Sequence, residues 1–233
     1  MYIHRWTGSK NILGVLDEPL IITDRQSEQI AKDLKMEYYL YEKLTETKKN
    51  EALLDQVRAG MCDMDTVYIL FTSGSTGMPK GTVISHRALI SYINWVTEEF
   101  AFDEHTSFGS QTPLYFSMSV TDLYSTIKCG GTYHIIPKQY FSFPLNLIGF
   151  LNEHQVNTIY WVPTAISILS NWKAFDVAKP EYLVKSTVCR GSYADKAVKL
   201  LDTYFRTGDH VCESVWSDRD NRYLYFLCGE QGV

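Results

Sequence analysis

Ten consecutive residues, 72–81, have the composition of a loop that binds phosphate: Thr-Ser-Gly-Ser-Thr-Gly-Met-Pro-Lys-Gly. Their three glycines let the backbone approach a ligand closely and turn N–H groups toward it. The four hydroxyl side chains can donate hydrogen bonds to phosphate oxygens, and Lys80 adds a positive charge. These residue types predict that the phosphates of a nucleotide bind here.

Two other interpretations of this loop are weaker. A Walker A loop requires Gly-x4-Gly-Lys followed by Ser or Thr, and counting from Gly74 places Pro79 and Gly81 at two of those fixed positions. A polar surface turn is also rich in Ser, Thr and Gly. Ten specified residues in one run favour the phosphate loop over a plain turn.

The residues just before the loop predict how it is positioned. Residues 67–71 are an apolar, charge-free run, which is typical of a buried parallel strand. We therefore expect an interior strand there, with the loop at the carboxyl edge of the sheet, where such folds bind ligands.

Strand and helix patterns alternate along the rest of the chain, which predicts an α/β fold with a mostly parallel sheet flanked by helices. Asp24 is a candidate N-cap, and the charged run 42–51 is interpreted as a solvated connection to a helix that ends near Gly60. Further strands are predicted at 20–23, 38–41, 133–136, 158–162, 183–189 and 223–227, and helices at 86–100, 120–128, 145–154, 164–172 and 194–204.

Composition excludes several function classes. Apolar residues make up 45% and charged residues 21% of 233 residues, as in ordinary globular proteins. A net charge of −5 without a basic run argues against nucleic acid. Five scattered cysteines predict neither a disulfide framework nor a zinc site. No apolar stretch is long enough to span a membrane or serve as a signal core, so we expect no membrane partner and a cytoplasmic protein.

The loop and its continuation, residues 82–89, resemble the signature of the adenylate-forming (AMP-binding) superfamily. The sequence of residues 20–175 most resembles the amino-acid adenylation domains of nonribosomal peptide synthetases and the D-alanine–carrier protein ligases. The resemblance implies ATP-dependent carboxylate activation, in which a small carboxylic acid forms an acyl-adenylate and releases pyrophosphate. It also implies ATP and Mg²⁺ as cofactors and a carrier protein as the partner that accepts the acyl group.

The same resemblance implies roles for individual loop residues. The loop would hold the β- and γ-phosphates, with Lys80 and Thr76 as catalytic residues and Thr76 as a ligand of Mg²⁺. The cofactor-binding residues implied in the loop are Thr72, Ser73, Gly74, Ser75, Thr76, Gly77, Lys80 and Gly81.

A second cofactor contact is implied near residue 209. The run Phe205-Arg206-Thr207-Gly208-Asp209 resembles the family's Tyr-Arg-Thr-Gly-Asp, whose Asp accepts both ribose hydroxyls. Four of these residues alone fit many surface turns, but their place after the phosphate loop supports Asp209 as a nucleotide ligand.

Residues 116–124 resemble the segment that forms one wall of the family's acyl pocket, which implies Phe116, Ser117 and Thr121 as substrate-binding residues. Amino-acid adenylation domains usually carry Asp where Ser117 stands, and that Asp pairs with the substrate α-ammonium. A buried cation is costly to leave unpaired, so either the substrate is not an ordinary α-amino acid or the chain no longer handles one. A plain core role for Phe116, Met118 and Tyr124 stays open.

The chain also departs from the family. It contains no Tyr-Gly-Pro-Thr-Glu, which would supply an adenine-stacking aromatic and a metal-binding Glu, and Glu230 stands where an Arg is expected. We expect 1–233 to be a single, truncated adenylation-domain core, internally shortened after Tyr204, without the lysine-bearing C-terminal subdomain and impaired in catalysis. The alternative is a non-catalytic remnant that binds nucleotide or another protein.

Overall fold

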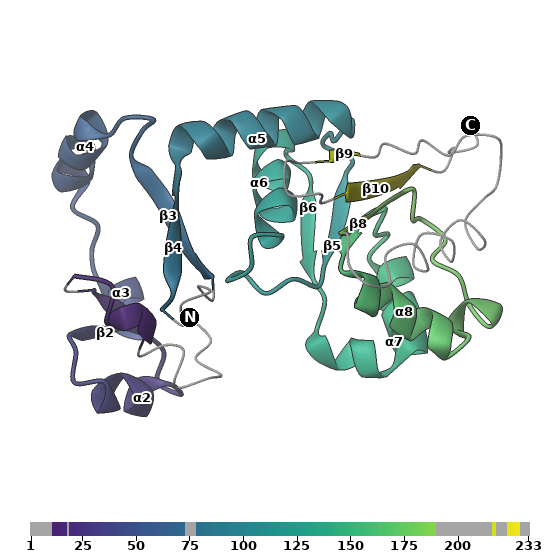
Figure 1. Cartoon of the computed structure of the whole chain (residues 1–233), viewed down its shortest axis with the longest axis horizontal. Helices are drawn as coiled ribbons and strands as arrows, with labels where there is room; N and C mark the ends of the chain where they lie inside the picture. Colours follow the sequence, from purple (N-terminus) through teal and green to yellow (C-terminus); the bar gives the residue numbers. More distant parts are fainter. Residues whose placement is uncertain (1–10, 18, 73–77, 190–215, 218–222, 229–233) are drawn as a thin grey trace. The chain divides into compact units, whose positions relative to one another are not determined.

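The computed structural model describes residues 11–17, 19–72, 78–189, 216–217 and 223–228 (Figure 1). Its backbone packs into two compact units, one up to Ser91 and the other from Tyr92 onward, and each is described by itself. The predicted helix 194–204 lies outside the described residues. That 1–233 forms one domain stays a prediction.

The first unit opens with two short parallel strands, β1 (Ile21–Thr23) and β2 (Tyr38–Leu40), joined through helix α2 (Glu28–Asp33). Both strands were predicted. The prediction of Asp24 as N-cap was wrong: Ser27 occupies the cap position, and the Asp24 carboxylate accepts a hydrogen bond from the Ser27 amide at 2.7 Å. That local bond forms a turn before the helix, as Asp side chains commonly do.

The charged run that follows is partly helical. Helix α3 (Tyr41–Glu46) lies within it and buries none of its residues, so the run is solvated as predicted but is not merely a connection. Helix α4 (Glu51–Gly60) ends where predicted, and the Asn50 side chain caps its start by accepting from the Leu53 amide at 3.1 Å.

The phosphate loop joins two antiparallel strands, β3 (Thr66–Thr72) and β4 (Lys80–Ser85), which form a two-stranded sheet. The prediction of a buried, interior parallel strand at 67–71 was therefore wrong. Its apolar side chains pair across the ribbon, with Ile69 opposite Val83, and Ile69 remains 39% exposed. A short apolar run does not distinguish a buried parallel strand from a hairpin strand, since both require β-branched and aromatic residues.

The second unit contains a six-stranded sheet in the order β6-β5-β7-β8-β10-β9. Its first four strands pair in parallel, whereas the pairings of β8 with β10 and of β10 with β9 are antiparallel, which confirms the mostly parallel α/β fold. The predictions missed β5, because its sequence Ser-Phe-Gly-Ser contains one apolar side chain. The strands are β5 (Ser107–Ser110), β6 (Thr132–Ile135), β7 (Thr158–Trp161), β8 (Lys185–Cys189), β9 (Trp216–Ser217) and β10 (Tyr223–Cys228).

Four α-helices lie within one residue of the predicted ranges 86–100, 120–128, 145–154 and 164–172. On α5, Leu89, Ile93 and Val96 recur at helical spacing and are buried. Helix α6 ends at Gly130, whose left-handed backbone (φ 73°) suits glycine. The helices are α5 (His86–Glu99), α6 (Ser119–Cys129), α7 (Pro144–Glu153) and α8 (Pro163–Asn171), with 3-10 turns η1 (Lys138–Ser142) and η2 (Ala174–Asp176). None of the described helices combines the length and apolar character needed to cross a bilayer.

The sheet of the second unit is covered on both faces. Toward α7 and α8 it presents Ile159 and Trp161, and the Trp161 indole N–H donates to the Gly109 carbonyl at 2.7 Å. A Cβ at Gly109 would lie 2.8 Å from Val156, in the turn after α7, and 3.3 Å from Leu151 of α7, so helix and strand approach closely there. Toward α5 and α6 it presents Phe108 and Thr158. This second face holds the cavity described below.

Candidate functional site

The described ends of the phosphate loop are held together by β-pairing. Thr72 is the cross-strand partner of Lys80, and both belong to the first unit. Lys80 is an exposed residue at the start of β4. The predicted contacts Ser73, Gly74, Ser75, Thr76 and Gly77 lie outside the described residues, as does Asp209. Their roles stay predictions.

Gly81 has a packing role that its predicted phosphate contact did not anticipate. It pairs with Phe71 across the hairpin, and a Cβ at this position would lie 2.9 Å from Ile69 Cγ2 and 3.2 Å from the Phe71 ring. The absence of a side chain at Gly81 thus lets the side chains of Phe71 and Ile69 lie over the ribbon beside the loop. Contact between Gly81 and phosphate stays a prediction.

The hairpin is anchored at the end opposite the loop. Arg87, at the start of α5, forms a bidentate ion pair with Asp63, with Nε–Oδ2 at 2.7 Å and Nη2–Oδ1 at 3.0 Å. The guanidinium group lowers the pKa of Asp63 below its ordinary value. The Arg87 and His86 amides donate to the carbonyls of Asp63 and Asp65 at 2.7 and 3.0 Å. These bonds fix the base of the ribbon, while the ion pair itself, being exposed, adds little stability.

The predicted substrate residues lie in the second unit, on the turn before α6 and on its first helical turns. Phe116 is 55% exposed and stacks on Tyr115, with ring centroids 4.9 Å apart. Ser117 is also exposed. The plain core role left open for Phe116 is therefore wrong, since its ring is largely outside the core. Thr121, in contrast, is buried.

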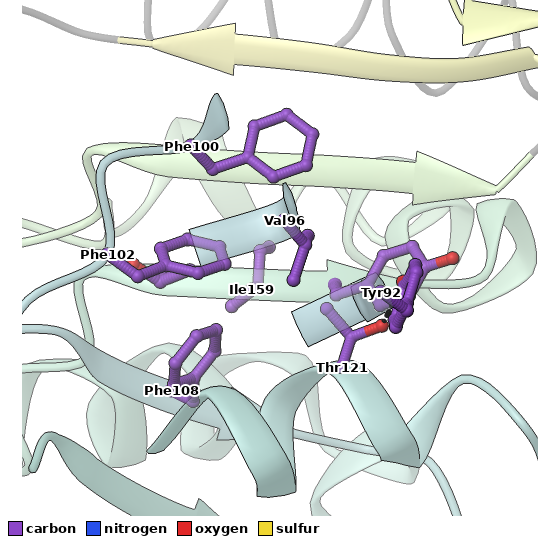
Figure 2. Close-up of a pocket in the computed structure, with 9 residues that line it drawn as sticks. Tyr92, Val96, Phe100, Phe102, Phe108, Thr121 and Ile159 are labelled. Carbon is purple, nitrogen blue, oxygen red and sulfur yellow. Dashed lines mark hydrogen bonds between the residues drawn. The ribbon is translucent and has the colours of Figure 1, made fainter. Parts of the chain in front are cut away.

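Thr121 lines a small cavity between the sheet and the helices α5 and α6, which we call the α5–α6 cavity (Figure 2). Its volume is about 10 Å³, close to the minimum space for one water molecule. The residues around it are Tyr92, Val96, Phe100, Phe102, Phe108, Thr121, Thr158, Ile159 and Tyr160. Of the predicted site residues that the structure describes, Thr121 is the one that borders this cavity.

One side of the cavity is closed by a pair of hydroxyl groups. The Tyr92 and Thr121 oxygens are 2.7 Å apart, and Figure 2 shows this hydrogen bond joining α5 to α6. Tyr92 is 36% exposed. Sequence reasoning did not predict its polar contact with Thr121, because no spacing in the sequence indicates it.

A buried carboxyl group next to Thr121 was also missed. Asp122 is fully buried, and neither of its oxygens has a hydrogen-bond partner of normal geometry among the described residues. Burial raises the pKa of Asp122 to about 8, and the neighbouring Ser110 hydroxyl opposes part of that shift. At neutral pH its carboxyl group is therefore mostly protonated. The spacing of Ser119, Asp122 and Ser125, three residues apart, was the available signal for a buried polar stripe.

The AMP-binding enzyme family matches residues 4–217. The chain belongs to this family. It is 32% identical over 162 residues to the D-alanine--D-alanyl carrier protein ligase of Lacticaseibacillus rhamnosus, covering 70% of this chain and 32% of that protein. It is 34% identical over 105 residues to the L-proline--[L-prolyl-carrier protein] ligase of Pseudomonas fluorescens, covering 45% and 21%. The chain thus spans a third or less of the curated relatives it matches.

Several solved structures share the fold of this chain at low sequence identity. The complex of VinN with L-aspartate has a TM-score of 0.72 at 14% identity, covering 92% of this chain and 54% of that one. The adenylation domain of a keto acid-selecting nonribosomal peptide synthetase module has a TM-score of 0.73 at 15% identity, covering 90% and 40%. These likenesses show that the AMP-binding chain has the fold of part of an adenylation domain.

Proposed function

We propose that this AMP-binding chain is the nucleotide- and acyl-binding core of an enzyme that activates a small carboxylic acid with ATP and transfers it to a carrier protein. The observation that carries the proposal is the family match over residues 4–217, which includes the complete phosphate loop. The curated relatives are ligases that join D-alanine or L-proline to a carrier protein. Because the five cysteines are scattered along the sequence and predict no disulfide framework, we also propose a cytoplasmic location.

The residues of the loop fit a Mg²⁺-bound nucleotide. Hydroxyl groups and the exposed Lys80 ammonium supply donors and positive charge for phosphate oxygens, and Thr76 supplies an oxygen ligand for the metal. When bound, Mg²⁺ neutralises phosphate charge that develops as pyrophosphate leaves. Asp209 would accept the ribose hydroxyls, and Phe116, Ser117 and Thr121 would lie on the acyl side.

Ser117 supports a substrate without an α-ammonium group. The side chain is neutral, so it offers no charge to pair with a cation, and an unpaired cation loses solvation without compensation. A keto, hydroxy or unsubstituted carboxylic acid has no such requirement. We therefore propose that ordinary α-amino acids are poor substrates.

The test is ATP–pyrophosphate exchange with matched sets of α-amino, α-keto and α-hydroxy acids, with an intact adenylation domain as control. We expect amino-acid-dependent exchange to stay below about a tenth of the control rate, a barrier difference of about 1.4 kcal/mol or more. Ser117→Asp should raise the relative rate with α-amino acids, while the charge-matched control Ser27→Asp, at the N-cap of α2 in the first unit, should not. Amino-acid exchange within tenfold of the control would contradict the proposal.

The second candidate is a non-catalytic nucleotide-binding or protein-interaction role. It is favoured by the missing Tyr-Gly-Pro-Thr-Glu, which removes both a stacking aromatic and a metal-binding carboxylate. Loss of such groups typically costs orders of magnitude in rate. Tight ATP binding without exchange for any acid in the panel would favour this candidate over activation.

A further inference from the structure

We propose that Tyr92 is a specificity-determining residue, which closes the α5–α6 cavity and limits the length of the hydrocarbon tail that the cavity accepts. The inference rests on the proposed function, because it assigns the tail to a carboxylic acid substrate. It names the substrate class more narrowly: carboxylic acids with a short, uncharged, apolar tail.

The inner wall of the cavity is aromatic and aliphatic. Phe102 stacks edge-on against Phe108 with ring centroids 4.9 Å apart, and Phe100 lies 5.8 Å from Phe102. Val96 completes this wall, and all four side chains are buried (Figure 2). Among the described residues, no charged side chain lines the cavity. A carboxylate or ammonium group would lose its solvation there, so the part of a ligand inside must be hydrocarbon.

The hydroxyl groups of Tyr92, Thr121 and Thr158 already form hydrogen bonds within the protein. Tyr92 and Thr121 share a hydrogen bond of 2.7 Å, and the Thr158 hydroxyl donates to the Asn157 side chain at 2.9 Å. Because these bonds form within the protein, a hydrocarbon group that enters leaves these hydroxyls satisfied. Entry of an apolar tail therefore carries no cost from unpaired hydrogen-bonding groups at these positions.

Tyr92 is the most exposed residue that lines the cavity, at 36%, whereas Phe108, Val96 and Ile159 are exposed by 2% or less. Its ring therefore forms the wall between the cavity and solvent, held by the bond to Thr121. The cavity of about 10 Å³ has no room for more than a water-sized group beside this ring. A smaller side chain at position 92 would enlarge the space toward solvent without removing any part of the inner aromatic wall.

The variants follow from this geometry. Tyr92→Ala and Tyr92→Leu remove the ring, and Leu retains an apolar side chain for packing of α5. Tyr92→Phe retains the ring and loses only the hydrogen bond. Ile90→Ala is the matched control, because Ile90 lies on the same helix, is 52% exposed and does not line the cavity.

The experiment measures binding of straight-chain carboxylates from propanoate to octanoate, and of the alcohols of equal length, by calorimetry on the whole chain without ATP. We expect wild type and Ile90→Ala to prefer the shortest tails. In Tyr92→Ala and Tyr92→Leu the preference should shift toward longer tails by about tenfold, the usual range for one extra methylene in an apolar pocket. Tyr92→Phe should resemble wild type, and thermal melts would establish that each variant is folded.

The role proposed for Tyr92 would be overturned if affinity depended on tail length in the same way in wild type, Tyr92→Ala and Tyr92→Leu. The same shift in Ile90→Ala, or no binding of any acid to any of the proteins, would also overturn it. Pyrophosphate exchange with the same acids separates the two proposals. If the preferred tail length shifts in the binding experiment but no acid supports pyrophosphate exchange, Tyr92 determines the tail length and the proposed carboxylate activation is rejected. Exchange whose length profile is unchanged by Tyr92→Ala would support activation and reject the role of Tyr92.

Discussion

The phosphate-loop hairpin and the α5–α6 cavity differ in how the chain holds them. The loop extends from two strands that, among the described residues, pair only with each other, and the first four residues of β4 are exposed. The cavity is enclosed by two helices and the central strands of a sheet covered on both faces. A glycine-rich loop that binds by backbone groups needs little packing around it, whereas an apolar pocket exists only through packing. Substitutions should therefore act locally in the hairpin and globally around the cavity.

The largest effect is expected at Asp122, which lies in the packed region. The pKa of this carboxyl is raised to about 8 in the folded state, whereas an unfolded Asp titrates near its ordinary value. The unfolded state therefore releases the proton first, and stability is greatest below about pH 4 and falls up to about pH 8. The slope is at most about 1.4 kcal/mol per pH unit.

Asp122→Asn should remove this dependence, and urea unfolding at several pH values from 4 to 9 would measure it. The exposed Asp55→Asn serves as control and should leave the slope unchanged. If wild type and Asp122→Asn lose stability equally as the pH rises, Asp122 is not the group responsible.

An intermediate effect is expected at Gly81 in the hairpin. Alanine there would bring its Cβ to 2.9 Å from Ile69 and 3.2 Å from the Phe71 ring, and such overpacking costs about 1–2 kcal/mol. Amide hydrogen exchange should accelerate in β3 and β4 while β5 and β7 keep their rates. Phe71→Leu combined with Gly81→Ala should recover part of the loss. Equal acceleration in the sheet of the second unit would show that the hairpin does not respond locally.

The smallest effect is expected at His134, whose ring packs against His154 with centroids 4.9 Å apart. Burial, and then the neighbouring His154, lower the pKa of His134. The unfolded chain therefore takes up the proton first as the pH falls, and this group makes the protein less stable below about pH 6.5. His134→Phe should weaken the loss between pH 7 and 5 in thermal melts, whereas the exposed His105→Gln should not. A loss as steep as in wild type would exclude His134 as its source.

The sequence predicted what short-range chemistry dictates. The helices α5 to α8 were recognisable because their apolar residues recur on one face, and the nucleotide loop because glycines and hydroxyls have few other reasons to occur together. The antiparallel partner of β3 was not predictable, since residues 67–71 suit either pairing. Nor was the contact between Tyr92 and Thr121, which are 29 residues apart and meet only when two helices pack on one sheet.

The central claim is that this AMP-binding chain holds ATP through the loop at residues 72–81. The most direct test is calorimetric titration of the chain with Mg²⁺-ATP, comparing wild type with Lys80→Ala and with Lys49→Ala, an exposed lysine between α3 and α4. We expect Lys80→Ala to weaken binding by about 1.5–3 kcal/mol, as for a lost charge-assisted bond, and Lys49→Ala to leave binding unchanged. Equal affinities of wild type and Lys80→Ala would contradict the claim.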